Sequence, residues 1–262
     1  MGNQPAALIT GASSGIGLEL AKVFARHGHD LVLVARNKQK LDELGLELGG
    51  GHGVFVKTIQ KDLSDSHAPE EIYDLLKRDW INVGIVVNNA GFATYGLFNE
   101  IEMKPELEML HVNIIALTHL TKLFLKDMVK EGTGRILNVA STAAFQPGPL
   151  MAAYYASKAY VLHFSEAISN EVKGSGVTVS VLCPGSTATG FQKRADMEES
   201  RLIAGKNIMS ARTVAEYGYK GLMAGKTIII PWWGSKVVVQ LNRLVPRSFA
   251  VRAIRAIQER RK

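Results

Sequence analysis

Cysteine is almost absent from this chain of 262 residues. A single thiol, Cys183, cannot form an intrachain disulfide, which excludes a fold stabilised by disulfides. It also favours a reducing compartment, so we expect a cytoplasmic protein. No run approaches the roughly 20 apolar residues of a membrane-spanning helix. The first residues also lack a basic and apolar signal segment. The seven histidines show no spacing with acidic residues or cysteine that is typical of a metal site, and we expect no metal.

Acidic residues are scarce at the end of the chain. Residues 236–262 carry eight basic side chains and one acidic residue, Glu259, which leaves 23 of each sign for the rest of the chain. The net charge of +7 therefore belongs to the tail, which weakens the case for a nucleic-acid-binding core, and we expect no nucleic-acid partner.

Seven short runs rich in β-branched residues alternate with longer amphipathic segments. The predicted strands cover residues 6–10, 31–35, 53–58, 83–87, 135–140, 177–182 and 227–231. Near-continuous apolar strands joined by helical crossovers indicate a parallel sheet that helices cover on both faces. We therefore expect an α/β fold with a seven-stranded parallel sheet, in one domain of residues 1–233 with a helical extension of residues 234–262.

Three further segments stand out in length or irregularity. The longest predicted helices cover residues 106–131 and 152–174. Residues 185–209 are the least regular and follow a strand end, where α/β proteins place either a substrate lid or a simple connection.

A glycine-rich turn joins the first predicted strand to the first helix. Gly11 permits a tight exit from the strand, Gly15 removes a side chain where a pyrophosphate approaches, and Gly17 lets the helix pack against the sheet. The unpaired N–H groups of a helix N-terminus favour such an anion. The residues expected to bind the pyrophosphate are Gly11, Ser13, Ser14, Gly15, Ile16 and Gly17.

The ends of the second and third strands carry opposite charges. Arg36 follows the second strand, where dinucleotide folds read the adenosine ribose, and a guanidinium there favours NADP over NAD. The alternative is a solvated arginine at a helix start. Asp62 and Leu63 follow the third strand at a position suited to an adenine contact, although Asp62 also fits the N-cap of the next helix.

The segment from Ser141 to Lys158 contains several candidate catalytic side chains close together in sequence. A hydroxyl follows an apolar strand at Ser141, and Tyr154 and Lys158 lie four residues apart, on one face of a predicted helix. An adjacent ammonium stabilises a phenolate, so Lys158 can lower the pKa of Tyr154. Tyr154 is then a candidate general acid or base, and Ser141 a hydrogen-bond donor to a substrate oxygen.

With these motifs, the chain resembles the single-domain branch of the short-chain dehydrogenase/reductase family, which has a doubly wound Rossmann-type fold. The ordered motifs are Thr10 to Gly17, Asn88 to Gly91, Asn113, Ser141, Tyr154 with Lys158, and Pro184 with Gly185. The resemblance implies that Tyr154 is the catalytic acid/base, that Ser141 orients the carbonyl, and that Lys158 binds the nicotinamide ribose. It also implies that Asn113 holds a water in a proton relay.

The same resemblance implies further cofactor contacts. The residues concerned are Asn89, Ala90, Gly91, Tyr154, Lys158, Pro184, Gly185, Thr187 and Thr189. Thr187 departs from the branched aliphatic residue usual at its position. Tyr155 lacks the four-residue spacing to Lys158 and is expected to pack.

The sequence therefore predicts an NADP(H)-dependent oxidoreductase that transfers a hydride between nicotinamide and a carbonyl/alcohol pair, in the reductive direction. The alternatives are an NAD-dependent alcohol dehydrogenase and a dinucleotide-sensing module without turnover. An apolar ketone, aldehyde or acyl substrate is expected because several bulky apolar residues are candidates for the pocket lining. These are Phe92, Tyr95, Phe145, Leu150, Phe191 and Met209.

The tail contains two predicted amphipathic helices separated by Pro246. It resembles the extension of bacterial reductases related to ketoacyl and hydroxysteroid reductases. Three roles remain open: a cap over the substrate mouth, a surface for anionic membrane, or a dock for an acidic carrier protein or nucleic acid. The two long helices resemble the dimer-forming pair of the family, so we expect a homodimer or a homotetramer.

Overall fold

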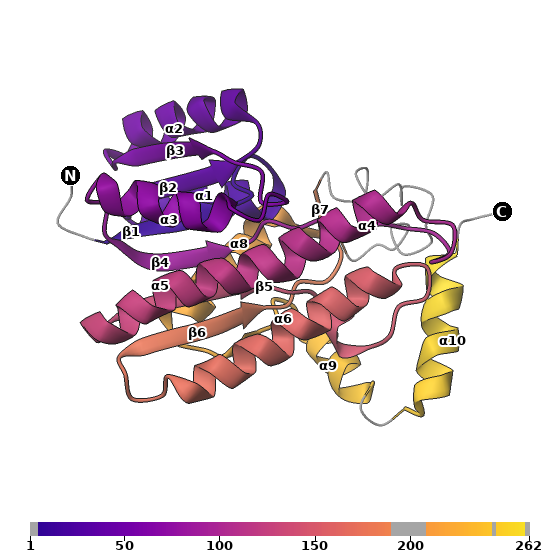
Figure 1. Ribbon diagram of the computed structural model, residues 1–262. Coiled ribbons are helices and arrows are strands. Elements are labelled where there is room, and N and C mark those ends of the chain that lie inside the picture. Colours follow the sequence, from indigo (N-terminus) through magenta and orange to yellow (C-terminus); the bar gives the residue numbers. More distant parts are fainter. Residues whose placement is uncertain (1–4, 190–207, 243–244, 260–262) are drawn as a thin grey trace.

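The computed structural model describes residues 5–189, 208–242 and 245–259 (Figure 1). Its centre is a seven-stranded parallel sheet in the order β3-β2-β1-β4-β5-β6-β9. The strands are β1 Ala6–Thr10, β2 Leu31–Ala35, β3 Val56–Gln60, β4 Val83–Asn88, β5 Gly134–Val139, β6 Val177–Leu182 and β9 Ile228–Ile229. The doubly wound Rossmann-type α/β fold expected from the sequence is confirmed.

Helices cover both faces of this sheet. On one face lie α1 Gly15–Arg26, α2 Lys38–His52 and α8 Ala211–Met223; on the other lie α3 Ala68–Arg78, α5 Leu117–Glu131 and α6 Ala152–Glu171. Alternate residues of one strand point to opposite faces, so Ala7 and Ile9 belong to the first buried cluster and Leu8 to the second. This double burial is why the strands are almost wholly apolar in sequence.

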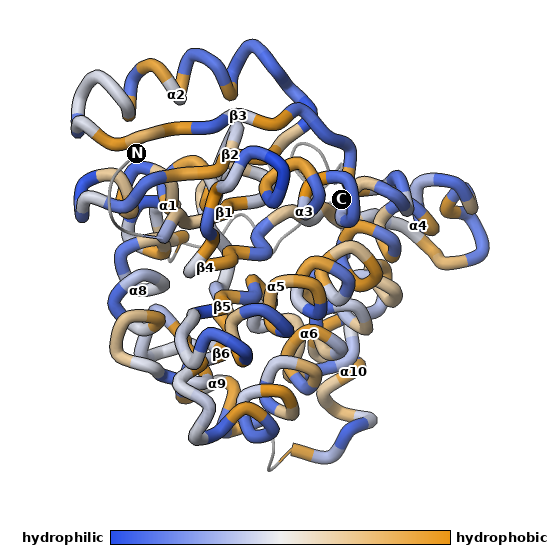
Figure 2. The backbone as a smooth tube through the Cα atoms, turned by 60° about the vertical axis from the view of Figure 1, so that its left-hand side comes forward, coloured by the Kyte–Doolittle hydropathy of each residue, from blue (hydrophilic) through white to orange (hydrophobic). Residues whose placement is uncertain are grey.

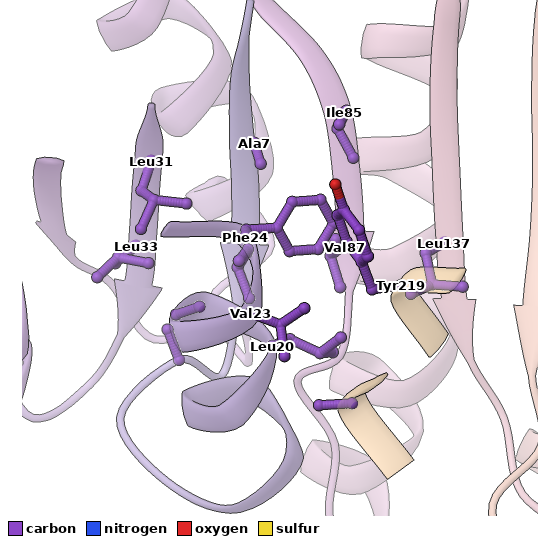
Figure 3. Close-up of a cluster of buried hydrophobic side chains, with 14 of the residues drawn as sticks. Ala7, Leu20, Val23, Phe24, Leu31, Leu33, Ile85, Val87, Leu137 and Tyr219 are labelled. Carbon is purple, nitrogen blue, oxygen red and sulfur yellow. The ribbon is translucent and has the colours of Figure 1, made fainter. Parts of the chain in front are cut away.

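Aromatic rings fill the first cluster between α1, α8 and the sheet. Phe24 and Tyr219 meet edge to face, with ring centroids 5.0 Å apart, and Figure 3 shows them beside Val87 and Leu137 of the strands. Helix α2 is more exposed and alternates hydrophilic and hydrophobic turns in Figure 2, as expected for a helix with one face on the sheet.

The third strand begins later than predicted, at Val56 instead of residue 53. Gly53 ends α2 in the left-handed conformation with φ of 67°, which glycine adopts without a steric penalty. The residues from Gly53 to Phe55 therefore complete the helix-to-strand connection.

The predicted helix of residues 106–131 is longer and less regular than expected. It starts with α4 Met103–Leu110, passes through a π-helical segment η1 His111–Ala116, and continues as α5. Asn113 lies in the π-helical segment. π-Helical turns are uncommon and often occur at functional sites.

Short elements complete the carboxyl edge. A 3-10 turn, η2 Thr142–Phe145, follows Ser141, and β7 Thr187–Ala188 pairs with β8 Met209–Ser210 in a small parallel sheet that the sequence did not predict. Of the irregular region at 185–209, residues 190–207 lie outside the described residues.

The C-terminal extension forms the two expected helices, α9 Trp233–Leu241 and α10 Arg247–Gln258, with Pro246 immediately before α10. Helix α10 lies at the right of Figure 1 and packs its Ile254 against a small buried cluster at the start of α6. Among the described helices, none has the length and hydropathy needed to cross a membrane.

Candidate active site

A cavity of about 470 Å³ lies at the carboxyl ends of the strands, the edge where open α/β sheets bind ligands. Most predicted site residues line it. These are Gly11, Ser13, Ser14, Gly15, Ile16, Arg36, Asp62, Leu63, Asn89, Ala90, Gly91, Ser141, Tyr154, Lys158, Pro184, Gly185, Thr187 and Thr189. Gly17 and Asn113 are not part of this lining, and both stand directly behind it.

The phosphate-binding turn has the shape and polarity that an anion requires. Gly11 and Gly15 have φ of 67° and 57°, in the left-handed region. Ser14 caps α1 without a hydrogen bond from its side chain, and the first turn contains no acidic residue. The N–H groups of the first turn are thus available to a pyrophosphate, and the helix dipole favours it.

Asn89 fastens this turn to the end of β4. Its side-chain amide donates to Thr10 O at 2.9 Å and to Gly11 O at 3.4 Å, while its backbone N–H donates to Thr10 Oγ1 at 3.0 Å. Gly17 packs against the same place: a Cβ on Gly17 would lie 2.3 Å from Gly11 O and 2.4 Å from Asn89 Nδ2. The expected role of Gly17 in close helix packing fits this geometry.

We expect Gly17→Ala to destabilise the protein and to displace the phosphate-binding turn. The clash involves a backbone oxygen that cannot move without breaking the Asn89 contacts, and overpacking of this kind costs about 1–3 kcal/mol. Thermal unfolding of the variant measures the loss. Gly50→Ala is the control, because Gly50 also lies inside a helix and a Cβ there meets nothing within 4 Å. A Gly17 variant no less stable than the control variant contradicts the packing role.

At the end of the cavity where the sequence predicts the adenosine contacts, Arg36 Nη1 and Asp62 Oδ2 lie 3.7 Å apart. Partial burial raises the pKa of Asp62, but hydrogen bonds from Ser64 and the Arg36 guanidinium together hold it below the ordinary value. Helix α3 begins at Ala68 with His67 as its cap, so the alternative of Asp62 as an N-cap is wrong. The cavity also includes Asn37, Lys61 and Ser64, three polar residues that the sequence reading did not single out.

At the other end, Ser141, Tyr154 and Lys158 come together. The side chains of Ser141 and Tyr154 are hydrogen-bonded, and Ser141 Oγ also lies 3.1 Å from the N–H of Ala143 in η2. Tyr154 and Lys158 lie one turn apart on α6, with the ammonium 5.8 Å from the centre of the phenol ring. The same ammonium donates to Val139 O at 2.9 Å.

Burial dominates the protonation of this group. It raises the pKa of Tyr154 well above the ordinary value, partly offset by the Ser141 hydrogen bond, and it lowers the pKa of Lys158 to about 8. The expected lowering of the Tyr154 pKa by Lys158 is thus not what the structure shows. The reason is that the ammonium binds the Val139 carbonyl and both groups are desolvated.

Asn113 is fully buried behind Gly91 and Phe92. Its Nδ2 donates to Phe92 O at 3.0 Å and to Ser157 Oγ at 3.1 Å, and its Oδ1 accepts from Phe92 N at 3.2 Å. A Cβ on Gly91 would lie 2.9 Å from Asn113 Oδ1. The side chain therefore holds the loop after β4 in place, and the water-relay role stays a prediction.

The substrate end differs most from expectation. Of the five apolar candidates among the described residues, only Phe92 lines the cavity, and Phe191 lies outside those residues. Tyr95, Phe145 and Met209 pack against buried clusters, and Leu150 is half-buried outside the lining. Tyr155, expected only to pack, lines the cavity together with Met151.

Neither the cysteine nor a metal-ligand group adds chemistry within the described residues. Cys183 is buried, and its desolvation raises the thiol pKa to about 12, so it is not a nucleophile at neutral pH. Within the described ranges, no group of three or more His, Cys, Asp or Glu side chains could hold a metal ion.

A phosphate-binding turn and a Ser-Tyr-Lys group that share one cavity define a nicotinamide-dependent class of α/β protein. The chain belongs to the short chain dehydrogenase family, whose model matches residues 5–200. It is 38% identical to mouse (Mus musculus) 17-beta-hydroxysteroid dehydrogenase type 3 over 194 residues. This match covers 71% of the chain and 61% of the mouse protein, so the chain spans less than two thirds of that relative.

Solved structures match over nearly the whole chain. A short-chain dehydrogenase from Sphingobium yanoikuyae in complex with NADPH is 32% identical, with a TM-score of 0.84 over 99% of this chain and 98% of that one. The bulky-bulky ketone specific alcohol dehydrogenase from Comamonas testosteroni is 30% identical, with a TM-score of 0.80 over 93% and 92%. The resemblance to the family predicted from sequence is confirmed.

Proposed function

We propose that this protein is an NADP(H)-dependent oxidoreductase that transfers a hydride between nicotinamide and a carbonyl/alcohol pair of a bulky apolar substrate, in the reductive direction. One observation carries the proposal: Ser141, Tyr154 and Lys158 line the same cavity as the phosphate-binding turn at Gly11 to Gly15. The residues that would hold a pyrophosphate and two hydroxyls that can polarise a carbonyl thus share one space.

Nicotinamide, when bound, would supply the hydride, and the side chains of this protein control the proton. Ser141 and Tyr154 donate hydrogen bonds to the substrate oxygen and stabilise the negative charge that develops on it. Burial keeps Tyr154 protonated at neutral pH, which is the form that reduction requires of an acid. Lys158, with a pKa of about 8, is mostly charged at pH 7. Its attraction for the phenolate left after proton transfer does not outweigh the burial of Tyr154, but it reduces the cost of forming that charge.

The cavity lining and two similar proteins support a class of substrate. Phe92, Met151 and Tyr155 give the substrate end large side chains. One relative is named for a hydroxysteroid and one for bulky ketones. Bulky ketones are therefore the substrate class that we propose. Purified protein mixed with NADPH and a panel of aryl ketones and ketosteroids should lose the NADPH absorbance. Cofactor binding without turnover across the panel supports the dinucleotide-sensing alternative instead.

We expect Arg36→Ala to weaken the binding of NADPH by about tenfold or more and the binding of NADH much less. The reason is that a hydrogen bond to a charged group contributes about 1.5–3 kcal/mol. Cofactor titration with both nucleotides measures the two losses. Lys38→Ala is the matched control, since it removes a neighbouring charge that is paired with Asp42. Equal losses for the two cofactors contradict the choice of NADP and favour the NAD-dependent alternative.

Exposed surfaces support two kinds of partner. Leu107, Ile115 and Tyr160 are exposed on α4, η1 and α6, which supports a homodimer or homotetramer through these helices. Light scattering tests this oligomeric state.

The tail carries exposed Trp233 and Phe249, with no acidic residue between Glu216 and Glu259. These features support peripheral contact with anionic membrane, and sedimentation with phosphatidylserine vesicles tests it against a tail-deleted chain.

A further inference from the structure

The two helices of the C-terminal extension each end against residues that form the wall of the cavity. Asn242, which directly follows α9, donates a hydrogen bond from Nδ2 to Gln146 Oε1. Gln258, the last residue of α10, has its Nε2 at 2.6 Å from Tyr155 Oη and 3.6 Å from Met151 Sδ. Gln146, Met151 and Tyr155 line the cavity, whereas Asn242 and Gln258 are not part of its lining. The extension therefore contacts this wall from behind.

Gln258 also joins two separate segments beside the cavity. It is completely buried, although much of α10 is exposed. Its backbone carbonyl accepts a hydrogen bond from Tyr95 Oη at 2.6 Å, and its side-chain amide donates to Tyr155 Oη. Tyr95 belongs to the loop after β4, and Tyr155 to the start of α6. The same two segments meet where the N–H of Gly96 donates to Leu150 O at 2.9 Å. The end of α10 thus fastens both segments at one point.

The side chain of Tyr155 is held at its ring and at its hydroxyl. A Cβ on Gly148 would lie 2.3 Å from Tyr155 Cγ and Cδ2, so the loop before α6 packs directly on the ring. Gln258 supplies the hydrogen bond at the hydroxyl. The ring of Tyr155 in turn meets that of Tyr154 edge to face, with centroids 6.0 Å apart. These contacts fix the wall relative to the candidate proton donor.

The amide of Gln258 is not well satisfied where it lies. Its Oε1 is buried and has no hydrogen-bond partner within the described part of the chain. Turning the amide by 180° exchanges the two atoms and leaves the nitrogen unsatisfied instead. A buried polar atom without a partner lowers stability, and a leucine of similar size avoids this penalty. The contact with Tyr155, and not stability, therefore accounts for an amide at this position.

We propose that Gln258 is a positioning residue that acts through Tyr155 to fix the wall against which a bulky ketone packs. The C-terminal extension thereby sets the size of the ketone that fits, without touching it. This inference rests on the proposed function, because it concerns the ketone that Ser141 and Tyr154 would bind. A phenol released from Gln258 can turn into the space that a second ring of the substrate needs, whereas a small ketone does not reach that space.

The test compares benzophenone, which has a ring on each side of its carbonyl, with acetophenone, which has one. Gln258→Leu should raise KM for benzophenone by about tenfold, leave its kcat unchanged and leave KM for acetophenone within about twofold of wild type. Because the leucine removes an unsatisfied amide, the melting temperature should stay within about 4 °C of wild type. Arg252→Gln, an exposed change on the same helix, is the control and should match wild type in each measurement.

Tyr155→Phe removes the same hydrogen bond from its other end and should also raise KM for benzophenone. The double variant with Gln258→Leu should raise it no further than the larger single effect, because residues that share one interaction are not additive. Single effects that multiply in the double variant overturn the proposal, since Gln258 then acts independently of Tyr155. A benzophenone KM that either single variant leaves at the wild-type value overturns it too.

Two measurements without turnover separate failure of this inference from failure of the proposed function. The first is calorimetric binding of both ketones to the NADPH-loaded protein. If Gln258→Leu loses affinity for benzophenone but wild type reduces neither ketone, the reaction is refuted and the positioning role is kept. Reduction of both ketones with unchanged affinities in Gln258→Leu refutes the positioning role and keeps the reaction.

The second measurement needs no ketone. Amide hydrogen exchange of residues 142–155 in the NADPH-loaded protein should be faster in Gln258→Leu than in Arg252→Gln, because the loop and the start of α6 lose their contact with α10. Equal exchange in the two variants overturns the positioning role, whether or not either ketone binds.

Discussion

Tyr154→Phe should lower kcat/KM for ketone reduction by about 10²–10⁴-fold, the usual contribution of a positioned general acid. The substitution removes one hydroxyl from a buried ring and therefore preserves packing. It takes away the proton that reduction requires and one of the two donors to the substrate oxygen, the other being Ser141. Stopped-flow or steady-state loss of NADPH absorbance measures the rate, and fluorescence titration measures cofactor affinity.

The matched control is Tyr160→Phe, which removes a phenol from the same helix. Its hydroxyl meets Thr118 Oγ1 at 3.0 Å on the exposed side of α6. This variant should keep wild-type activity, and Tyr154→Phe should keep wild-type affinity for NADPH to within a few fold. A Tyr154→Phe protein that reduces ketones at the wild-type rate would falsify the catalytic assignment.

Lys158→Met should abolish most activity and change the pH dependence of stability. Without the ammonium, the phenolate of Tyr154 loses the charge that stabilises it, and we expect a loss of about 10²-fold or more in kcat/KM. The methionine fills a similar volume in a buried position. Removing a desolvated ammonium from this position offsets the loss of its hydrogen bond to Val139 O, so the variant should still fold.

The stability effect has a definite direction. The pKa of Lys158 falls from 10.5 to about 8 on folding, so between these values the unfolded chain holds a proton that the native protein has released. The free energy of unfolding of the wild type therefore rises with pH across this window, and below pH 8 the penalty is constant. Relative to Lys158→Met, wild type should gain about 2–3 kcal/mol between pH 7 and 10. Urea unfolding of both proteins at the two pH values measures this gain. If the free energy of unfolding changes equally with pH in the two proteins, the lowered pKa of Lys158 is contradicted.

The sequence was most informative where local rules operate. The turn at Gly11 to Gly17 and the pair Tyr154 and Lys158 each need only a strand end or a helical repeat to be placed, and the structure brings them into one cavity. The strands were recognisable because burial on both faces makes them apolar throughout.

Residues that depend on distant contacts were not predictable. Gln258 is 103 positions from Tyr155, and only the packing of α10 on the start of α6 brings them together. The same is true of the pocket lining: Phe145 turned toward the cluster beneath η2, and Tyr95 toward the backbone of α10. Bulk and apolarity identify candidates for a wall, but the direction of each side chain depends on neighbours far away in the chain.

The π-helical segment from His111 to Ala116 alters the path of the chain only locally. A π turn contains one residue more than the α-helical turn it replaces, and the wider turn takes up that residue. Helices α4 and α5 therefore keep nearly the relative rotation of an uninterrupted α-helix. Met109 of α4 thus stays fully buried in the cluster beside Tyr154, while Asn113 inside the wide turn reaches the loop at Gly91 and Phe92. One extra residue thereby serves the loop after β4 without changing which face of α4 meets the core.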